Sequence, residues 1–541
     1  MKRNLLTLRT LFLSVLCVGI AFGAVAQKRK QAPVSRERVL ETMKRATRFM
    51  MDTVSYRGAF VWNYLPDFSR SWGEMEAKPT MGWVQSPGTP GIGHLRLDAY
   101  HATGDEYYYE AAEKVAGALI WAQLPCGGWN YCFDFAGEAS LKDWYNTIGK
   151  NGWRLEEFQH YYGNATFDDA ATPEAANFIL RMYVEKYDPK YKPTLDKAIG
   201  FVLESQYPIG GWPQRYPLRY EFSHHGNPDY SSYITLNDDV MEENTDFLIR
   251  CYQTLGTQSI MDPIIRSMNC MRILQQGKPQ AGWALQYTLD LAPAGARTYE
   301  PGGLSSHGTA SCIAKMMEYY RLTGDSKYLM GIPDALDFLE SIKLPPSEVA
   351  KTGRTLGEGL IMCPTVVEWK TGKPQYVHRR GSNVVNGEYY VDQNLEHVIG
   401  HYGSVRVINI ADLRRRFEEI RKIPVEELTK GSPLLEKGLV ELPKYFTRGR
   451  GGAMTEQQVA EVLAALNSRG YWPTPLRSTS NPYIGTEGAE VVTPGDYCST
   501  HVGDKFDTSP YSAKEPVEGI STQTYLQNMF GLIRYLDAER Q

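Results

Sequence analysis

The chain has 541 residues, of which 42% are hydrophobic and 22% charged, so it is long enough for one large domain or two to three average ones. Its formal net charge is -4 at pH 7. No basic tract is available to neutralise phosphates, which argues against a general nucleic-acid binder, and we expect no nucleic-acid partner.

The first 26 residues are typical of a secretory signal peptide. Lys2 and Arg3 form a basic head, an apolar run extends from Leu11 to Ile20, and small residues precede the expected cleavage after Ala26. No later run is apolar enough to span a bilayer. We therefore expect a secreted or periplasmic protein without a transmembrane segment, and we expect it to be a monomer.

From about residue 100 the chain repeats one pattern, in which two helices joined by a short break are followed by a Gly-Trp loop. These loops end at Trp129, Trp212 and Trp283, and a fourth pass resumes at Thr323. Such a repeat is typical of stacked helical hairpins. Closed into a ring, the hairpins give an all-α protein of the α/α-toroid class, which we expect to comprise residues 27–400.

The repeat fades after about residue 346. Alternating apolar residues predict a few short strands or long loops within residues 357–402, and residues 411–423 predict a charged, solvated helix. The last helix should span residues 521–538 and dock one apolar face on the body. We expect residues 401–541 to form a loop-rich, partly β extension.

Cysteine and histidine give weaker signals. Once Cys17 leaves with the leader, the remaining cysteines are odd in number, and their spacing fits no zinc site. Cys126 and Cys132 could form a disulfide, but two buried thiols fit the pattern at least as well. The adjacent His224 and His225 could bind a transition metal, although a solvent-exposed pair is the simpler interpretation.

Acidic pairs and an arginine occur in the loops between the repeat helices. The pairs are Asp168 with Asp169 and Asp238 with Asp239, and the arginine is Arg297. One such pair alone would only cap the following helix. Several gathered on one side of a ring could instead converge, and their carboxylate oxygens suit Ca2+.

Five segments, in this order, resemble the family 10 polysaccharide lyases, the pectate lyases of α/α-toroid fold. They are Thr166–Thr172 (TFDDAAT), Gly210–Pro217 (GGWPQRYP), Asn237–Met241 (NDDVM), Trp283–Gln286 (WALQ) and Ala296–Glu300 (ARTYE). The likeness covers roughly residues 85–385. It implies calcium-assisted β-elimination of polygalacturonate or a related uronic-acid polymer.

The resemblance also implies roles for single residues. Asp168 and Asp238 match the acidic calcium and substrate site, with Asp169 in support and Asp239 as a further metal ligand. Arg297 matches the proposed base. Because arginine is normally protonated, a carboxylate clamp or an ion pair within its own segment ranks first on chemistry alone. The residues expected to bind substrate are Trp212, Gln214, Arg215, Trp283, Gln286, Tyr299 and Arg379.

Departures from the family concern charge. The family carries a lysine where this chain has Tyr131 and an arginine where it has Thr365, and it usually has asparagine at the positions of Asp169 and Asp239. Fewer cations and more acids would weaken the grip on a strongly anionic polymer. The substrate could therefore differ from plain polygalacturonate.

Two other functions stay open. The paired acids could be the general acid and base of a glycoside hydrolase, a chemistry that α/α toroids also host, and its activity would survive chelation. Alternatively, the chain could be a non-catalytic glycan-binding protein on a lyase scaffold, as the changes at Tyr131 and Thr365 permit.

Overall fold

The computed structural model describes residues 34–152, 155–219, 229–380, 388–399, 403–446, 454–480, 496–497 and 510–538. The fold is mostly helical, with 50% of the described residues in helices. The predicted signal peptide, His224 and His225 lie outside the described residues.

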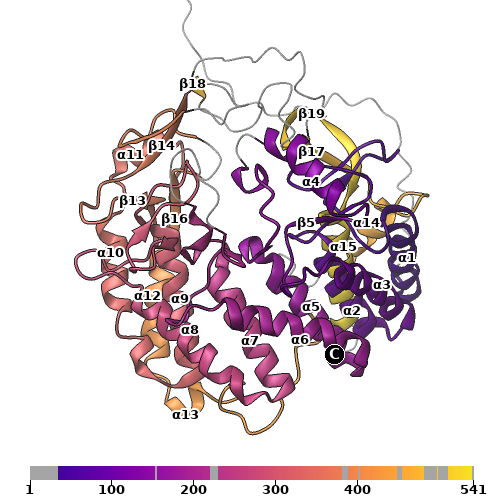
Figure 1. Ribbon diagram of the computed structural model, residues 1–541, viewed down its shortest axis with the longest axis horizontal. Coiled ribbons are helices and arrows are strands. Elements are labelled where there is room, and N and C mark those ends of the chain that lie inside the picture. Colours follow the sequence, from indigo (N-terminus) through magenta and orange to yellow (C-terminus); the bar gives the residue numbers. More distant parts are fainter. Residues whose placement is uncertain are drawn as a thin grey trace, which may run out of the picture.

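Four helical hairpins follow one another around the molecule (Figure 1). They are α2 (Thr89–Thr103) with α3 (Glu106–Ala122), α5 (Ala171–Lys186) with α6 (Lys192–Ser205), α7 (Val240–Leu255) with α8 (Met261–Ile273), and α9 (Ser306–Thr323) with α10 (Ile332–Ser341). Neighbouring hairpins touch through α2 and α5, α5 and α7, and α8 and α9. The predicted α/α-toroid class is confirmed.

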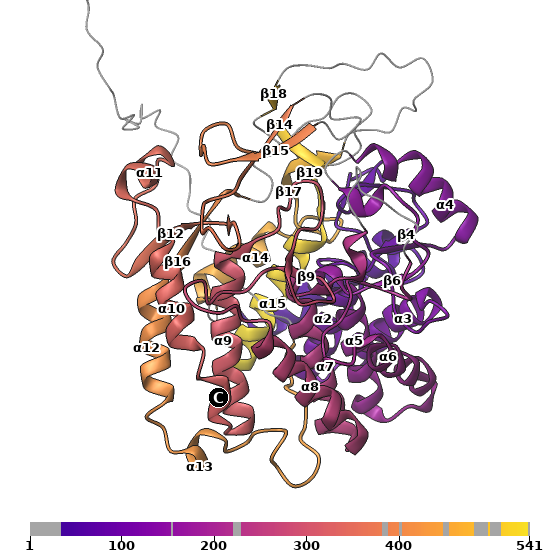
Figure 2. The same cartoon turned by 60° about the vertical axis from the view of Figure 1, so that its left-hand side comes forward.

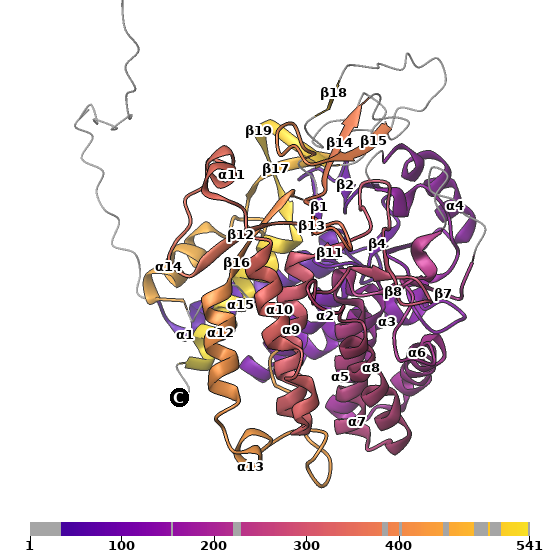
Figure 3. The ribbon, with the colours of Figure 1, turned by 90° about the vertical axis from the view of Figure 1, so that its left-hand side faces the viewer.

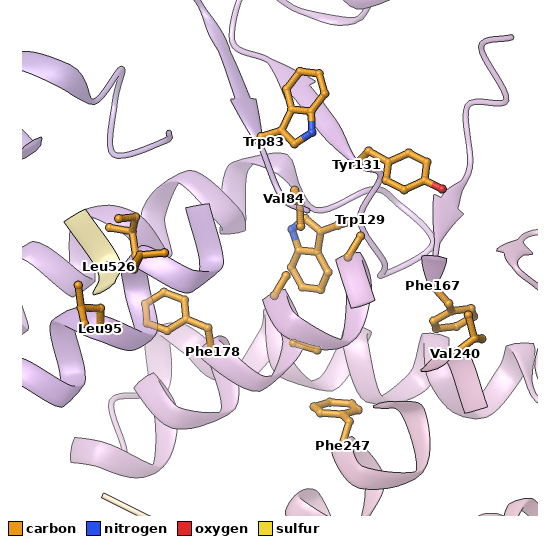
Figure 4. Packing of buried hydrophobic residues seen from close by; sticks show 14 of the residues in the cluster. Trp83, Val84, Leu95, Trp129, Tyr131, Phe167, Phe178, Val240, Phe247 and Leu526 are labelled. Carbon is orange, nitrogen blue, oxygen red and sulfur yellow. The ribbon is translucent and has the colours of Figure 1, made fainter. Parts of the chain in front are cut away.

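The tryptophans of the Gly-Trp loops are part of the core. Each indole N–H donates to a carbonyl near the end of the preceding helix: Trp129 to Leu119 (2.8 Å), Trp212 to Val202 (2.8 Å) and Trp283 to Met271 (2.7 Å). All three tryptophan side chains are fully buried. Figure 4 shows Trp129 packed among other buried hydrophobic side chains, such as Val84 and Phe178. The prediction that Trp212 and Trp283 line a substrate groove is therefore wrong.

Two-residue strands connect the Gly-Trp loops to the helices that follow them. β6 (Ala165–Thr166) pairs with β7 (Arg215–Tyr216) just before α5. β8 (Ile234–Thr235) pairs with β9 (Gln286–Tyr287) just before α7, and β9 also pairs with β10 (Pro293–Ala294). These short ladders fix where α5 and α7 begin.

Other helices cover the two ends of the hairpin series. α15 (Thr522–Ala538) packs on α1 (Arg36–Phe49) and α2, and α14 (Glu456–Ala465) packs on α1 and α15. α12 (Ile410–Ile420) packs on α9 and α10 (Figures 2 and 3). α12 and α15 lie close to the predicted helices at 411–423 and 521–538. The shorter helices are η1 (Met50–Val54), α4 (Glu138–Thr147), α11 (Pro346–Lys351) and α13 (Val425–Leu428).

The other strands, many of them only two or three residues long, form small antiparallel sheets. A five-stranded antiparallel sheet has the order β17 (Thr474–Ser480), β19 (Pro510–Ser521), β1 (Asn63–Tyr64), β2 (Ser71–Trp72) and β3 (Glu76–Ala77). Smaller ladders pair β12 (Leu360–Pro364) with β16 (Val405–Asn409), β14 (Tyr376–Arg380) with β15 (Glu388–Asp392) and β18 (Asp496–Tyr497), β4 (Met81–Trp83) with β5 (Cys132–Asp134), and β11 (Leu304–Ser305) with β13 (Val366–Val367).

The six cysteines in the described part of the chain are all free thiols, and five of them are buried. Cys126 and Cys132 therefore form no disulfide, in agreement with the thiol interpretation. Among the described residues, no helix is both long and apolar enough to cross a bilayer.

Candidate active site

The two acidic segments form turns of the same shape at the starts of neighbouring helices. Turn η4 (Asp168–Ala170) leads into α5, and turn η7 (Asn237–Asp239) leads into α7. Each contains two successive residues with left-handed backbone: φ is 49° and 56° at Asp169 and Ala170, and 50° and 57° at Asp238 and Asp239. This conformation is uncommon and costly for non-glycine residues, and such strained residues cluster at functional sites. The two turns are in contact.

The Gly-Trp loops hold both turns in place. The Thr166 N–H donates to the carbonyl of Trp129 (2.8 Å), and the Thr235 N–H donates to the carbonyl of Trp212 (3.0 Å). Thr166 lies two residues before Asp168, where η4 begins, and Thr235 lies two residues before Asn237, where η7 begins. The buried tryptophans thus help to position the acidic turns, because their backbone carbonyls accept these hydrogen bonds.

Three carboxyl groups converge where the turns meet. Burial and the charges of Asp168 and Asp169 raise the pKa of Asp238 well above its usual value. Burial, Asp168 and Glu74 do the same to the pKa of Asp169. The Oδ1 atom of Asp168 is buried and has no hydrogen-bond partner among the described residues. Crowded, incompletely paired carboxylates are unfavourable unless a proton or a cation compensates them.

A glutamine and a tyrosine contact this cluster from the segments just before and just after the first hairpin. Gln85 donates its side-chain N–H to Asp169 Oδ2 (2.6 Å) and to Glu74 Oε2 (3.0 Å). The Tyr131 hydroxyl donates to Asp168 Oδ2. Tyr131 therefore supplies a neutral hydrogen-bond donor where the resembling family has a charged lysine.

Asp239 does not join the cluster, although the sequence analysis places it among the metal ligands. Its pKa is raised first by burial, while Lys315 opposes the rise and Asp246 adds to it. Lys315 in turn bonds to Asp246 (3.3 Å). The turns explain this placement, because their left-handed residues pair Asp169 with Asp238 and Ala170 with Asp239. The cluster therefore contains Asp169, and not Asp239, in addition to Asp168 and Asp238.

Arg297 lies beside the cluster and forms ion pairs with several carboxylates. Its Nε and Nη2 atoms donate to the two carboxylate oxygens of Glu300 (2.8 and 3.0 Å), and Nη1 lies 3.3 Å from Glu157 Oε2. Its Nη2 atom is 4.0 Å from Asp238 Oδ2. The ion pair expected on chemical grounds, with Glu300, is confirmed. Burial raises the pKa of Glu157 to about 7.

The remaining predicted substrate residues are mostly buried. Arg215 lies over the rings of Tyr131 (5.0 Å) and Tyr162 (4.6 Å), and its Nη1 contacts Asn130 (3.4 Å). It therefore supports Tyr131 from a buried position. Gln214 is buried, and its carbonyl accepts the Phe167 N–H (2.9 Å).

Two further predicted residues lie near the segment after residue 375. Tyr299 is buried and packs against Tyr389, with ring centroids 5.5 Å apart. Arg379 lies in β14 opposite Tyr389, and its side chain is outside the described part of the structure.

A pocket of about 130 Å³ opens beside Asp238. Its lining includes Gln286, Tyr299 and Glu300, and also side chains that the sequence analysis did not single out as ligand-binding, His307 and Arg406. Glu74, Gln85 and Glu157 were missed as well. None of these residues stands in a recognisable motif, and only the pairing of distant strands and loops brings them to the site.

The carboxylates of the cluster could provide part of a calcium site. Among the described residues, no group of three or more His, Cys, Asp or Glu side chains is arranged to hold a metal ion. Asp168 and Asp238 nevertheless offer hard oxygen donors, and within the described part of the chain the Asp168 Oδ1 atom has no hydrogen-bond partner. These two carboxylates fit a cation that takes its other ligands from water and from a bound anion.

Comparison with known proteins supports the family resemblance within one part of the chain. No curated protein sequence gives a significant match. The solved structures include a mutant family 10 polysaccharide lyase from Cellvibrio cellulosa in complex with trigalacturonic acid, with 17% identity, 62% of this chain and 98% of that chain covered, and a TM-score of 0.40. A cellobiose 2-epimerase from Spirochaeta thermophila shows 10% identity, 94% and 99% coverage and a TM-score of 0.41. These structural likenesses are weak, and no conclusion rests on them.

The family model for pectic acid lyase matches residues 139–322. That region contains both acidic turns and Arg297. The resemblance is therefore confirmed, and the residues that match the pectic acid lyase model include the acidic turns and Arg297 of the candidate active site.

Proposed function

We propose that the protein is a secreted polysaccharide lyase that cleaves polygalacturonate, or a related uronic-acid polymer, by calcium-assisted β-elimination. One observation carries the proposal: Asp168, Asp169 and Asp238 meet beside the buried Arg297, within the family region. A cluster of acids that lacks enough cations of its own suits a bound Ca2+ and an anionic substrate.

In this proposal Asp168 and Asp238 would hold the calcium ion together with a uronate carboxylate of the substrate. When bound, the ion withdraws charge from that carboxylate and so makes the neighbouring C5 proton more acidic. Tyr131 fixes the orientation of Asp168 through its hydroxyl. Gln85 holds Asp169 in the same way.

Arg297 acts as a clamp in this account. Glu300, Glu157 and Asp238 surround its guanidinium, and three carboxylates favour its charged form. A charged guanidinium can orient a uronate carboxylate but cannot accept a proton. Glu157, with a pKa of about 7, is better matched to take the C5 proton near neutral pH.

The test is a product assay with polygalacturonate and other uronans, with calcium and with excess chelator. Elimination leaves a carbon–carbon double bond conjugated to the carboxylate, which absorbs in the ultraviolet. We expect this absorbance to rise only when calcium is present. Release of reducing sugar without the absorbance, and unaffected by chelator, would identify a glycoside hydrolase.

A hydrolase is the second candidate because the pKa of Asp238 is raised. The general acid of a glycosidase needs such a pKa. If neither unsaturated product nor reducing sugar appears while uronans still bind, the protein is a glycan-binding protein on a lyase scaffold.

A further inference from the structure

The pocket beside Asp238 contains hydrogen-bond donors from three separate parts of the chain. Gln286 lies in β9, His307 in the first turn of α9, and Arg406 in β16. β16 follows the region that resembles the lyase family, and its pairing with β12 places Arg406 opposite Cys363. The extension thus contributes a cation to a pocket that begins at an acidic turn.

Gln286 is a buried donor without a partner. Its side chain is only 2% exposed, and its Nε2 atom has no hydrogen-bond acceptor among the described residues. The backbone of Gln286 is fixed by pairing with Thr235 and Ala294. An amide N–H that is held at a pocket wall without an acceptor costs free energy, unless a ligand supplies the acceptor.

His307 and Arg406 lie close enough to interact. Burial, and then the positive charge of Arg406, lower the pKa of His307 to about 4. The Nδ1 atom of His307 is 2.9 Å from the Ser305 hydroxyl oxygen. His307 is therefore neutral at physiological pH, which leaves Arg406 as the cation of this wall.

Thr365 helps to position Arg406. Its hydroxyl donates to the carbonyl of Gly403 (2.7 Å), and its N–H donates to the carbonyl of Ser404 (2.9 Å). Its own carbonyl accepts the Ser306 N–H (3.0 Å) next to His307. Thr365 thus ties the start of β16 to the start of α9, so that Arg406 and His307 face one pocket.

Two acids also line the pocket, but each has a cation nearby. Glu300 receives two hydrogen bonds from the Arg297 side chain, and Asp238 lies 4.0 Å from the same guanidinium. The Glu300 carboxylate is therefore paired with Arg297, whereas Asp238 belongs to the acidic cluster that the proposed calcium ion would compensate. Gln286, His307 and Arg406 bring N–H donors to the lining of the same pocket.

We propose that this pocket is a carboxylate subsite, in which Arg406 and Gln286 bind the free carboxylate of a uronate residue next to the cleaved bond. The inference rests on the proposed function, because it assumes that a uronan occupies the site. It makes Arg406 a specificity-determining residue that distinguishes free uronate from its methyl ester.

The test compares wild type, Arg406→Ala and Arg406→Lys on polygalacturonate and on a highly methyl-esterified galacturonan. Losing a charge-assisted hydrogen bond should raise KM for polygalacturonate about tenfold or more, with little change in kcat. On the esterified polymer, Arg406→Ala should match wild type within about twofold, by the same reasoning. The lysine variant should retain part of the preference.

Arg421→Ala is the matched control, because Arg421 is an exposed arginine just past the end of α12 and away from the pocket. It should leave both substrates unaffected. Thermal unfolding checks that the Arg406 variants fold. An equal loss on both polymers, or an unchanged KM for polygalacturonate, would overturn the carboxylate subsite.

The subsite can also be tested if the lyase proposal fails. If wild type forms no unsaturated product from any uronan, calorimetry with trigalacturonate and with its carboxyl-reduced form replaces kinetics. At least about tenfold weaker binding of trigalacturonate to Arg406→Ala, with equal binding of the reduced form, would support the subsite. Equal affinity of wild type and variant for trigalacturonate would contradict it.

Discussion

The two acidic turns share one backbone but differ in chemistry. Both lead into a helix through two left-handed residues, and both follow a threonine whose N–H donates to the carbonyl of a Gly-Trp loop. At equivalent places, η4 has Asp168, Asp169 and Ala170, whereas η7 has Asn237, Asp238 and Asp239. The repeated backbone therefore determines which positions face the shared cluster and which face the neighbouring helix. The residue type at each position then determines whether a carboxylate lies there.

The largest difference should appear between the two acids of η7. We expect Asp238→Asn to lower kcat/KM at least about 100-fold, because it removes a carboxylate from the proposed calcium and substrate site. Asp239→Asn should change it less than about threefold, since Asp239 lies beside Lys315 outside that site. Steady-state rates of unsaturated product measure both variants.

A reversed order of these two effects would show that Asp239, and not Asp238, belongs to the site. The equivalent pair in η4 gives an independent check. There Asp169→Asn should be the more damaging change, and replacing Ala170 by serine should have little effect on the rate.

The next largest effect distinguishes two roles of Arg297, a clamp that binds a carboxylate and a base that accepts a proton. We expect Arg297→Lys to lose about 10- to 100-fold in kcat/KM, because lysine cannot reproduce the bidentate contact with Glu300. Its pH–rate profile should keep the shape of the wild-type profile. Glu157→Gln should instead remove the acidic limb of that profile, which reflects the group of pKa about 7.

If Arg297 were the base, its lysine variant would shift the pH optimum, and Glu157→Gln would keep the wild-type profile. Glu300→Gln serves as the matched control for charge. It keeps a side chain of the same size next to Arg297 but removes one of the surrounding carboxylates.

A smaller effect is expected at the departure from the family, Tyr131. Tyr131→Phe keeps the ring beneath Arg215 but removes the hydroxyl that donates to Asp168. We expect the calcium concentration for half-maximal rate to rise about tenfold, because Asp168 would lose the contact that orients it. An unchanged calcium response would mean that Asp168 is held by other contacts.

The smallest effect concerns stability. The folded-state pKa values of Asp169 and Asp238 are raised, so folding disfavours their charged forms, and this cost appears as the pH rises above the ordinary Asp value of 3.8. At neutral pH without calcium, Asp238→Asn should therefore raise Tm by a few degrees. The gain should vanish near pH 4. A lower Tm at pH 7 would contradict the crowded-acid account.

The hairpin repeat could be predicted from the sequence because its signals are local. Glycine closes three of the hairpins with a left-handed residue, at Gly104, Gly256 and Gly324. Both acidic segments and Arg297 could also be found, because they stand in motifs. The two acidic pairs are offset by one residue, because Asp169 and not Asp168 matches Asp238. The backbone angles show this match, and the threonines three residues before Asp169 and Asp238 would have indicated it from the sequence.

The rest of the site depends on long-range contacts. The tryptophans were expected in a groove because aromatic rings bind sugars, but nothing in the sequence shows that their indole N–H groups already have acceptors in the core. Gln85 and Glu157 reach the cluster from loops that carry no motif. Arg406 reaches the pocket only because β16 pairs with β12.

The most direct test of the account is the ultraviolet absorbance of wild type acting on polygalacturonate during a calcium titration, with Asp238→Asn and Asp239→Asn measured in parallel. The account predicts an unsaturated product whose rate saturates with calcium in wild type and Asp239→Asn and is nearly lost in Asp238→Asn. A rate that is independent of calcium, or that depends on Asp239 and not on Asp238, would contradict the claim that the two turns build one calcium-dependent site.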